Sequence, residues 1–312
     1  MIKEISYNSK EEWLQLRKQL GVGGSDAGAV IGMNPYKSAY TLWAEKTGRI
    51  PEFEGNLITE VGSYLEEFVA KLFERETGKK VRRKNRMLVN TEYPWAFGDV
   101  DRMVVGEKAF LEIKTTNSVP IMKQLRNSNE FPEAYYAQVV HYLAVSGLEK
   151  AYLAVLINCR EFKTFELERD EAEIEALMGA EAEFWCNYVK NDTPPPADGA
   201  ASTSETLTSI YPESDGSSVS LMAYESDLKQ YMSLGTHIKD LEKQRDEVAN
   251  RIKAFMGESG AGESDGYRVS WTSSMRLSFD AKRFAADHAN MDLSKYYKAS
   301  NYRTFKVTEN KH

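Results

Sequence analysis

The sequence predicts a mixed α/β domain, in which a mixed sheet is flanked by helices, followed by a C-terminal helical segment with a small β element. Apolar residues recur at helical spacing in segment 56–78, and short apolar runs at 109–115 and 151–157 are typical of strands. A polar, proline-containing stretch at 191–219 then separates the N-terminal domain, residues 1–190, from a C-terminal region, residues 220–312. We therefore expect a domain, a linker and an accessory region.

Within the first domain, a helix is expected to begin in segment 24–32, with Ser25 as its N-cap. Segment 56–78 should form a longer helix that ends at Gly78, with a face made of Leu65, Phe68, Val69, Leu72 and Phe73. The remaining elements expected are strands at 97–105, 109–115, 151–157 and 162–168, a helix at 132–147 and an acidic helix that ends near Tyr188.

The C-terminal region begins with apolar residues in nearly heptad spacing, interrupted near Gly235, which indicates a long helix for association or partner binding. These residues are Leu221, Tyr224, Leu228, Tyr231, Ile238, Leu241, Val248, Ile252 and Phe255. Strand-like segments follow at 267–271 and 302–308.

Composition describes a water-soluble globular protein, with 42% hydrophobic and 28% charged residues. No apolar run approaches the ~18 residues of a membrane span, and the start of the chain has no apolar signal-peptide core. Cys159 and Cys186 are the only cysteines and the four histidines are scattered, so neither a disulfide framework nor a zinc centre is expected. We expect a cytoplasmic protein.

The net charge of −7 argues against a nucleic-acid partner, but the local charge distribution differs. Segment 79–86 is strongly basic and contains no acidic residue, so it is either a solvated edge or a patch that contacts phosphates. Its basic residues are Lys79, Lys80, Arg82, Arg83, Lys84 and Arg86.

The stretch AFLEIKTT, residues 109–116, places Glu112 and Lys114 on one face of a strand, because side chains alternate across a strand. The simplest interpretation is a half-exposed strand with a polar outer face. A two-residue turn at Gly106 and Glu107 would instead pair Asp101 with Glu112, and Asp99 with Lys114, on one face. Paired carboxylates repel, and a divalent cation removes that repulsion, so this register indicates a Mg²⁺ site beside a lysine.

The motifs GDVD and LEIK, at 98–101 and 111–114, resemble the core of the PD-(D/E)xK nucleases, which have a restriction-endonuclease-like fold. Segments 21–48, 135–147 and 151–157 resemble the YqaJ viral recombinase group, phage-type alkaline exonucleases similar to lambda exonuclease. The resemblance covers about residues 10–190. It departs at residues 100–102, where Val-Asp-Arg replaces the common Pro-Asp-Gly.

The resemblance implies metal ligands at Asp101, Glu112 and the carbonyl of Ile113, with Asp99 as the alternative to Asp101. It also implies an acidic ligand at Glu66, with Glu67 as the alternative. Lys114 would be the catalytic lysine, and Gln138 would lie near it and a water. Tyr142 is four residues after Gln138 and therefore on the same helix face, where it is either part of the site or core-facing.

The glycine-rich segment 21–27 has two interpretations, a turn with a helix cap or an anion site at a helix N-terminus. The resemblance implies that Ser25 contacts the 5′-phosphate of a DNA end, with Arg17 as its partner.

The expected function is Mg²⁺-dependent DNA exonuclease activity, with two ions and Mn²⁺ as a substitute, acting 5′→3′ on double-stranded ends. By resemblance it would prepare single strands for an annealing recombinase and form a trimer. One alternative is a structure-specific endonuclease or repair nuclease of the same fold. The other is a non-catalytic DNA-binding scaffold.

Overall fold

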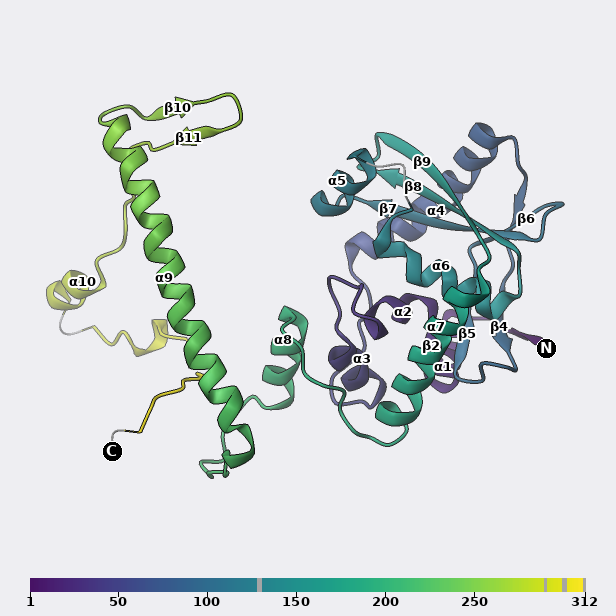
Figure 1. Cartoon of the computed structure of the whole chain (residues 1–312), viewed down its shortest axis with the longest axis horizontal. Coiled ribbons are helices and arrows are strands. Elements are labelled where there is room, and N and C mark those ends of the chain that lie inside the picture. The colour runs from purple at the N-terminus through teal and green to yellow at the C-terminus, as the bar shows by residue number, and fades with distance from the viewer. Residues whose placement is uncertain (128–130, 289–290, 299–301, 311–312) are drawn as a thin grey trace. The chain divides into compact units, whose positions relative to one another are not determined.

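The chain forms two compact units, Met1–Tyr211 and Pro212–His312. The computed structural model describes residues 1–127, 131–288, 291–298 and 302–310 (Figure 1). None of the helices in these ranges is long and apolar enough to cross a membrane.

The first unit contains two sheets. The larger has the order β3-β6-β7-β8-β9, in which β7 and β8 run parallel and the other neighbours run antiparallel. The smaller has the order β1-β4-β5-β2, with only β2 and β5 parallel. The strands are β1 (Ile2–Ser6), β2 (Val22–Gly23), β3 (Val81–Arg82), β4 (Arg86–Asn90), β5 (Ala96–Gly98), β6 (Arg102–Val104), β7 (Ala109–Thr116), β8 (Lys150–Ile157) and β9 (Glu161–Glu168).

Helices flank the larger sheet on both faces (Figure 1). Leu111 and Ile113 of β7 pack against α4, whereas Phe110 packs with α6 and α7 on the opposite face. The helices of this unit are α1 (Lys10–Leu20), α2 (Gly24–Val30), α3 (Ala39–Lys46), α4 (Leu57–Thr77), α5 (Val119–Asn127), α6 (Glu133–Ser146), α7 (Glu171–Glu183), η1 (Phe184–Val189) and α8 (Ala201–Ile210). The predicted mixed sheet flanked by helices is confirmed.

Helix α4 shows how the sequence specifies its own boundaries. Asn56 accepts hydrogen bonds from the backbone N–H groups of Ile58 and Thr59, and Gly78 ends the helix with a φ of +73°. Val69 and Phe73 are completely buried against the sheet. Phe68, which the periodicity assigned to the same face, is 53% exposed, because it lies at the edge of the buried face of the helix.

Part of the predicted linker is folded. Helix α8 lies within residues 191–219, and its Leu207 and Ile210 pack on the apolar cluster that contains Leu42 of α3 and Phe184 of η1. The division between the units therefore falls after Tyr211 rather than after residue 190, because apolar residues of α8 continue the core of the first unit.

The second unit contains the predicted long helix, α9 (Glu225–Met256), which continues through Gly235 without a break. Apolar side chains of its seam are exposed, among them Ile238, Leu241 and Phe255. Residues 302–308 form no strand, and instead the ring of Phe305 packs 5.5 Å from that of Tyr231 on α9. The other elements are η2 (Met222–Tyr224), β10 (Ala261–Glu263), β11 (Arg268–Ser270), α10 (Ala281–Asp287) and η3 (Ser294–Tyr296), with β10 and β11 antiparallel.

A buried ion pair ties α6 to its neighbours. Nδ1 of His141 lies 2.7 Å from Oε1 of Glu181 on α7, and Nε2 donates to the carbonyl oxygen of Phe97 on β5 at 2.8 Å. Burial alone would lower the pKa of His141, but the charge of Glu181 and these hydrogen bonds outweigh it and raise the pKa. Both side chains are completely buried.

We expect Glu181→Gln to lower the free energy of unfolding by about 3 kcal/mol, because it leaves a buried charge without its partner. The raised pKa of His141 means that this stabilisation is lost as the pH rises through that raised value. Burial raises the pKa of Glu181, so the stabilisation is also lost at low pH, as that carboxylate becomes protonated. Urea unfolding at several pH values measures the difference. The exposed Glu175→Gln on the same helix is the control, and it should change stability by less than about 0.5 kcal/mol. Equal stability of the two variants would contradict this role.

Candidate active site

Strand β7 places Glu112 in the interior of the protein rather than on a solvent face. The side chain of Glu112 is 3% exposed and that of Lys114 is 25% exposed. The alternation predicted for this strand is confirmed, but the half-exposed interpretation is wrong, because α6 covers the face that carries both residues.

The predicted hairpin register is confirmed. Arg102 pairs with Leu111 and Met103 pairs with Phe110, and continuing this register places Asp101 opposite Glu112. Gly106 adopts a φ of +84° in the turn, a conformation that favours glycine. Oδ2 of Asp101 accepts a hydrogen bond of 2.7 Å from the backbone N–H of Ile113, which fixes the carboxylate beside β7.

Asp99 is engaged differently from Asp101. Its Oδ2 accepts hydrogen bonds from the hydroxyl of Tyr7 and from Nε1 of Trp13, both at 2.8 Å. Asp99 therefore anchors the N-terminal segment, although it also lines the cavity described below. Of the two alternatives, the geometry favours Asp101 as the partner of Glu112.

Glu112 is the centre of a polar cluster. Its Oε1 lies 2.8 Å from Nζ of Lys114 and accepts a hydrogen bond of 2.8 Å from Nε2 of Gln138. The same Nε2 lies 3.1 Å from the hydroxyl of Tyr142, so the predicted pair on one face of α6 does converge on β7. Its Oε2 is buried and has no hydrogen-bond partner among the residues that the structure describes.

This unpartnered oxygen is compatible with a bound cation. A buried carboxylate oxygen without a partner costs free energy, and a divalent cation bound by carboxylate oxygens would remove that cost. Burial, and then the charge of Glu112, raises the pKa of Asp101 well above its ordinary value. Burial also raises the pKa of Glu112, although Lys114 opposes that rise.

Glu66 and Glu67 on α4 are both bound to Arg102, whose importance the sequence did not reveal. Nη1 of Arg102 forms an ion pair with Oε1 of Glu66, and Nη2 lies 3.2 Å from Oε2 of Glu67. Glu66 lines the cavity together with Asp101 and Glu112, whereas Glu67 does not. In the described ranges, no three His, Cys, Asp or Glu side chains cluster closely enough to form a complete metal site.

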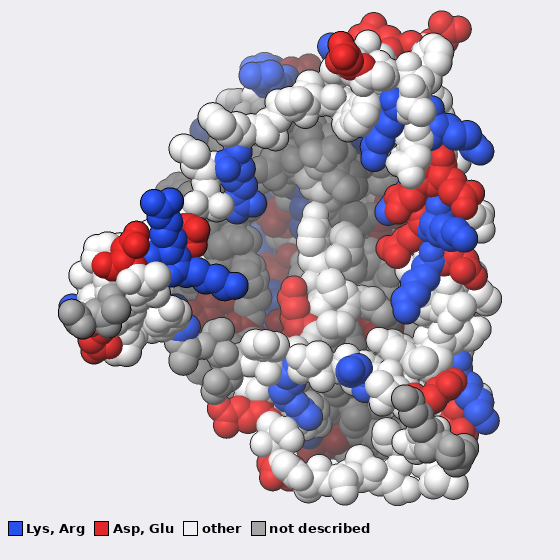
Figure 2. Space-filling model, turned by 90° about the vertical axis from the view of Figure 1, so that its left-hand side faces the viewer, with Lys and Arg blue, Asp and Glu red and all other residues white. Residues whose placement is uncertain are grey.

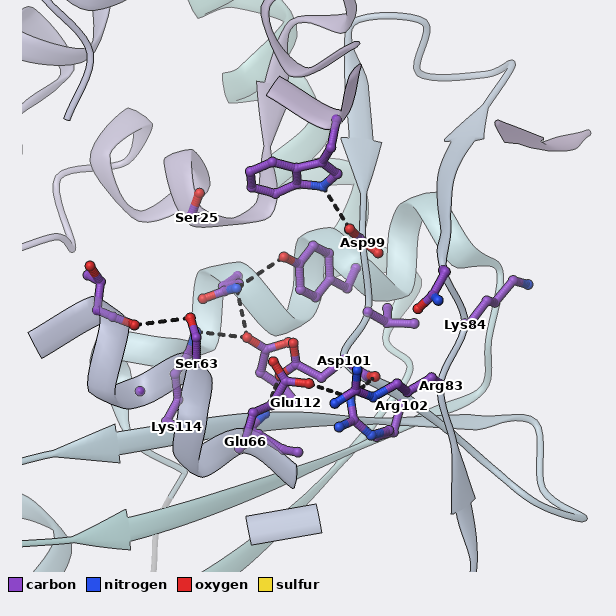
Figure 3. A pocket seen from close by; sticks show the side chains of 18 of the residues that line it. Ser25, Ser63, Glu66, Arg83, Lys84, Asp99, Asp101, Arg102, Glu112 and Lys114 are labelled. Atoms are coloured by element: carbon purple, nitrogen blue, oxygen red, sulfur yellow. Dashed lines mark hydrogen bonds and ion pairs between the residues drawn. The ribbon is translucent and has the colours of Figure 1, made fainter. Parts of the chain in front are cut away.

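These side chains line a cavity of about 590 Å³. Figure 3 shows Glu66, Asp101, Arg102 and Glu112 gathered in one part of it, with Ser25 on a separate helix. Sequence reasoning also missed the contribution of the N-terminal segment, Tyr7 and Trp13, because no local pattern connects it with Asp99.

Arg17 and Ser25 meet at this cavity, with Nη2 of Arg17 3.3 Å from Oγ of Ser25. The prediction that Ser25 is the N-cap of α2 is wrong. Gly23 occupies that position, and its N–H donates to Asp26. Burial would raise the pKa of Asp26, but Lys46, 2.9 Å away, and Arg17 lower it. Lys46 thus offsets the negative charge next to Ser25.

The basic segment 79–86 is largely neutralised. Five of its six basic residues pair with acidic side chains: Lys79 with Glu107, Lys80 with Glu74, Arg83 with Glu67, and both Lys84 and Arg86 with Glu4. On the face drawn in Figure 2, Lys and Arg side chains are likewise interspersed with Asp and Glu. Of the six, Arg83 and Lys84 line the cavity.

Comparison with known proteins supports the resemblance seen in the sequence. Residues 12–149 match the model of the YqaJ-like viral recombinase domain. A Bacillus subtilis (strain 168) protein named "Uncharacterized protein YqaJ" is 37% identical over 314 residues, which span 99% of this chain and 97% of that protein.

Among solved structures, the alkaline exonuclease LHK-Exo of Laribacter hongkongensis has a similar fold. It aligns with a TM-score of 0.50 and 20% identity over 59% of this chain and 94% of that one. The same enzyme in complex with dAMP aligns with a TM-score of 0.50 and 18% identity. By its identity to the Bacillus protein along nearly the whole length, the chain belongs to the YqaJ-like viral recombinase family.

Proposed function

We propose that the protein is a Mg²⁺-dependent DNA exonuclease that degrades double-stranded ends in the 5′→3′ direction. The observation that carries the proposal is the pairing of Asp101 with Glu112, whose buried Oε2 has no partner, next to Lys114. The name of the structural relative, an alkaline exonuclease, is consistent with this chemistry.

Asp101, Glu112 and the carbonyl oxygen of Ile113 would hold Mg²⁺, or Mn²⁺ as a substitute. When bound, the ion supplies Lewis-acid polarisation of a phosphoryl oxygen and neutralises negative charge. In the reaction a water oxygen bonds to phosphorus, the bond to the 3′ oxygen breaks, and that oxygen takes up a proton. The product is a nucleoside 5′-monophosphate.

Lys114 acts as a charged donor in this proposal. Burial would lower its pKa, but the carboxylates of Glu112 and Asp101 outweigh burial and raise the pKa, so the side chain is an ammonium at neutral pH. An ammonium cannot accept a proton from water, and it therefore stabilises charge on the phosphate or orients the water. Gln138 holds Glu112 in place, and Tyr142 holds Gln138.

Digestion of linear duplex DNA labelled separately at each end tests the proposal. We expect release of nucleotides from the 5′ ends with Mg²⁺, none after chelation, and no cleavage of closed circular DNA. Cleavage of closed circles would instead identify an endonuclease of the same fold. The trimer, the annealing recombinase and the cytoplasmic location stay predictions.

Replacing members of the cluster should abolish cleavage without unfolding the protein. Lys114→Met, Asp101→Asn and Glu112→Gln should each reduce kcat by at least about 10²-fold, since each removes a preorganised charge from the reacting phosphate or its cation. Asp99→Asn distinguishes the two candidate ligands. It should weaken the contact with Trp13 and reduce activity far less than Asp101→Asn does. Normal turnover of Lys114→Met at saturating Mg²⁺ would refute the assignment.

The contact between Arg17 and Ser25 predicts a preference for phosphorylated ends. A terminal 5′-phosphate carries up to two negative charges and accepts several hydrogen bonds, whereas a 5′-hydroxyl does not attract a guanidinium. Wild-type protein should digest 5′-phosphorylated duplex faster than 5′-hydroxyl duplex. Arg17→Ala or Ser25→Ala should reduce that ratio more than it reduces the rate on 5′-hydroxyl ends. Equal wild-type rates on both substrates would exclude the phosphate pocket.

Position at the cavity, rather than freedom from ion pairs, narrows the predicted DNA contacts of segment 79–86 to Arg83 and Lys84. Changing both to Gln should weaken duplex binding and reduce the slope of log K against log salt by about 2, at ~0.9 per phosphate contact. The matched control is Lys79→Gln with Lys80→Gln, because those two side chains pair with Glu107 and Glu74 away from the cavity. Equal slopes of log K against log salt in the two double variants would mean that the whole segment is a solvated edge without DNA contacts.

A further inference from the structure

Arg102 is a buried cation placed between the candidate metal ligands. Its side chain is 4% exposed, which is unusual for arginine unless the charge is paired. Nη1 forms the ion pair with Glu66 and also donates to the carbonyl oxygen of Asp101 at 2.7 Å. Three different groups, including Glu67, therefore fix the guanidinium next to the carboxylates of the site.

Arg102 forms an ion pair with the carboxylate of Glu66, which a second metal ion would need as a ligand. Glu66 is the acidic residue that would add a further ligand to Asp101 and Glu112, and its Oε1 is bound to the guanidinium instead. A divalent cation at Glu66 would have to displace Nη1 or lie beside a fixed positive charge. At a separation of ~4 Å, like charges in partly buried surroundings repel strongly.

The charge balance supports a single ion. When ionised, Glu66, Asp101 and Glu112 carry three negative charges, and the two cations in direct contact with Glu66 and Glu112, Arg102 and Lys114, carry two positive charges. One divalent ion and one phosphodiester would bring the total to zero, whereas a second divalent ion would leave an excess of two positive charges. Glu67 does not alter this balance, because Arg83 lies 3.1 Å from its carboxylate.

We propose that Arg102 replaces one of the two metal ions expected for this site, so that the protein binds a single divalent ion. This inference rests on the proposed metal-dependent function. Arg102 is thus a positioning residue that holds Glu66 away from the ion, and Asp101 and Glu112 form the binding site.

Calorimetric titration of the full chain with Mn²⁺, without DNA, tests the proposal. Wild type should bind one ion per chain. Arg102→Met removes the charge and keeps an extended apolar side chain. This variant should bind a second ion, with an affinity at least tenfold higher than that of any weak second binding to wild type. Arg102→Lys, the matched control, keeps the charge and should bind one ion. The double variant Arg102→Met with Glu66→Gln should again bind one ion per chain.

Glu66→Gln in the wild-type background decides the question even if Arg102→Met does not fold. If Glu66 is held by Arg102, this variant keeps one ion with an affinity within about threefold of wild type. Two wild-type ions of similar affinity, one of them lost in Glu66→Gln, would overturn the inference and leave the proposed function intact. A wild type that binds no Mn²⁺ would overturn both.

Discussion

The burial of Glu112 beside Asp101 is the constraint on which the site depends. β7 lies between β6 and β8 in the sheet, and α6 covers the face that carries Glu112. Withdrawing a carboxylate from water is costly unless charges and hydrogen bonds replace the lost hydration. Lys114 and Gln138 satisfy Oε1, and nothing in the described part of the chain satisfies Oε2. The fold thus retains an unfavourable arrangement that a cation would relieve.

Helix α6 connects this arrangement to the stability of the domain. Gln138 and Tyr142 face β7, whereas His141, on the intervening turn, binds Glu181 and the carbonyl of Phe97. Close approach to α6 also explains two glycines of the motifs. A Cβ on Gly24 would lie 2.4 Å from the ring of Tyr142, and one on Gly98 would lie 2.5 Å from a methyl of Val145. The same helix therefore orients the site and closes the core.

Features that depend on neighbouring residues in the chain were predictable from the sequence. The alternation of Glu112 with Ile113 and the turn at Gly106 together determined the position of Asp101, because a two-residue hairpin fixes its register. The boundaries of α4 at Asn56 and Gly78 were equally local.

Features that depend on distant partners were not predictable. Arg102 directly follows Asp101, but its role comes from α4, which is 36 residues away in sequence at Glu66. Asp99 is likewise bound by residues distant in the sequence, Tyr7 and Trp13. The basic segment 79–86 looked like a phosphate-binding patch because its acidic partners, such as Glu4, lie elsewhere in the chain.

The local pairing of charge limits how an acidic protein would attract DNA. With a net charge of −7 and most of segment 79–86 neutralised, long-range attraction is weak, and phosphates in water at physiological salt are screened beyond ~8 Å. Under the proposed function, affinity must therefore come from short-range contacts inside the cavity, where Arg17 and Lys114 are accessible to a phosphate. Such contacts form only when a phosphate enters the cavity. Under that function, binding therefore depends on contacts at the site itself rather than on attraction from the surrounding protein surface.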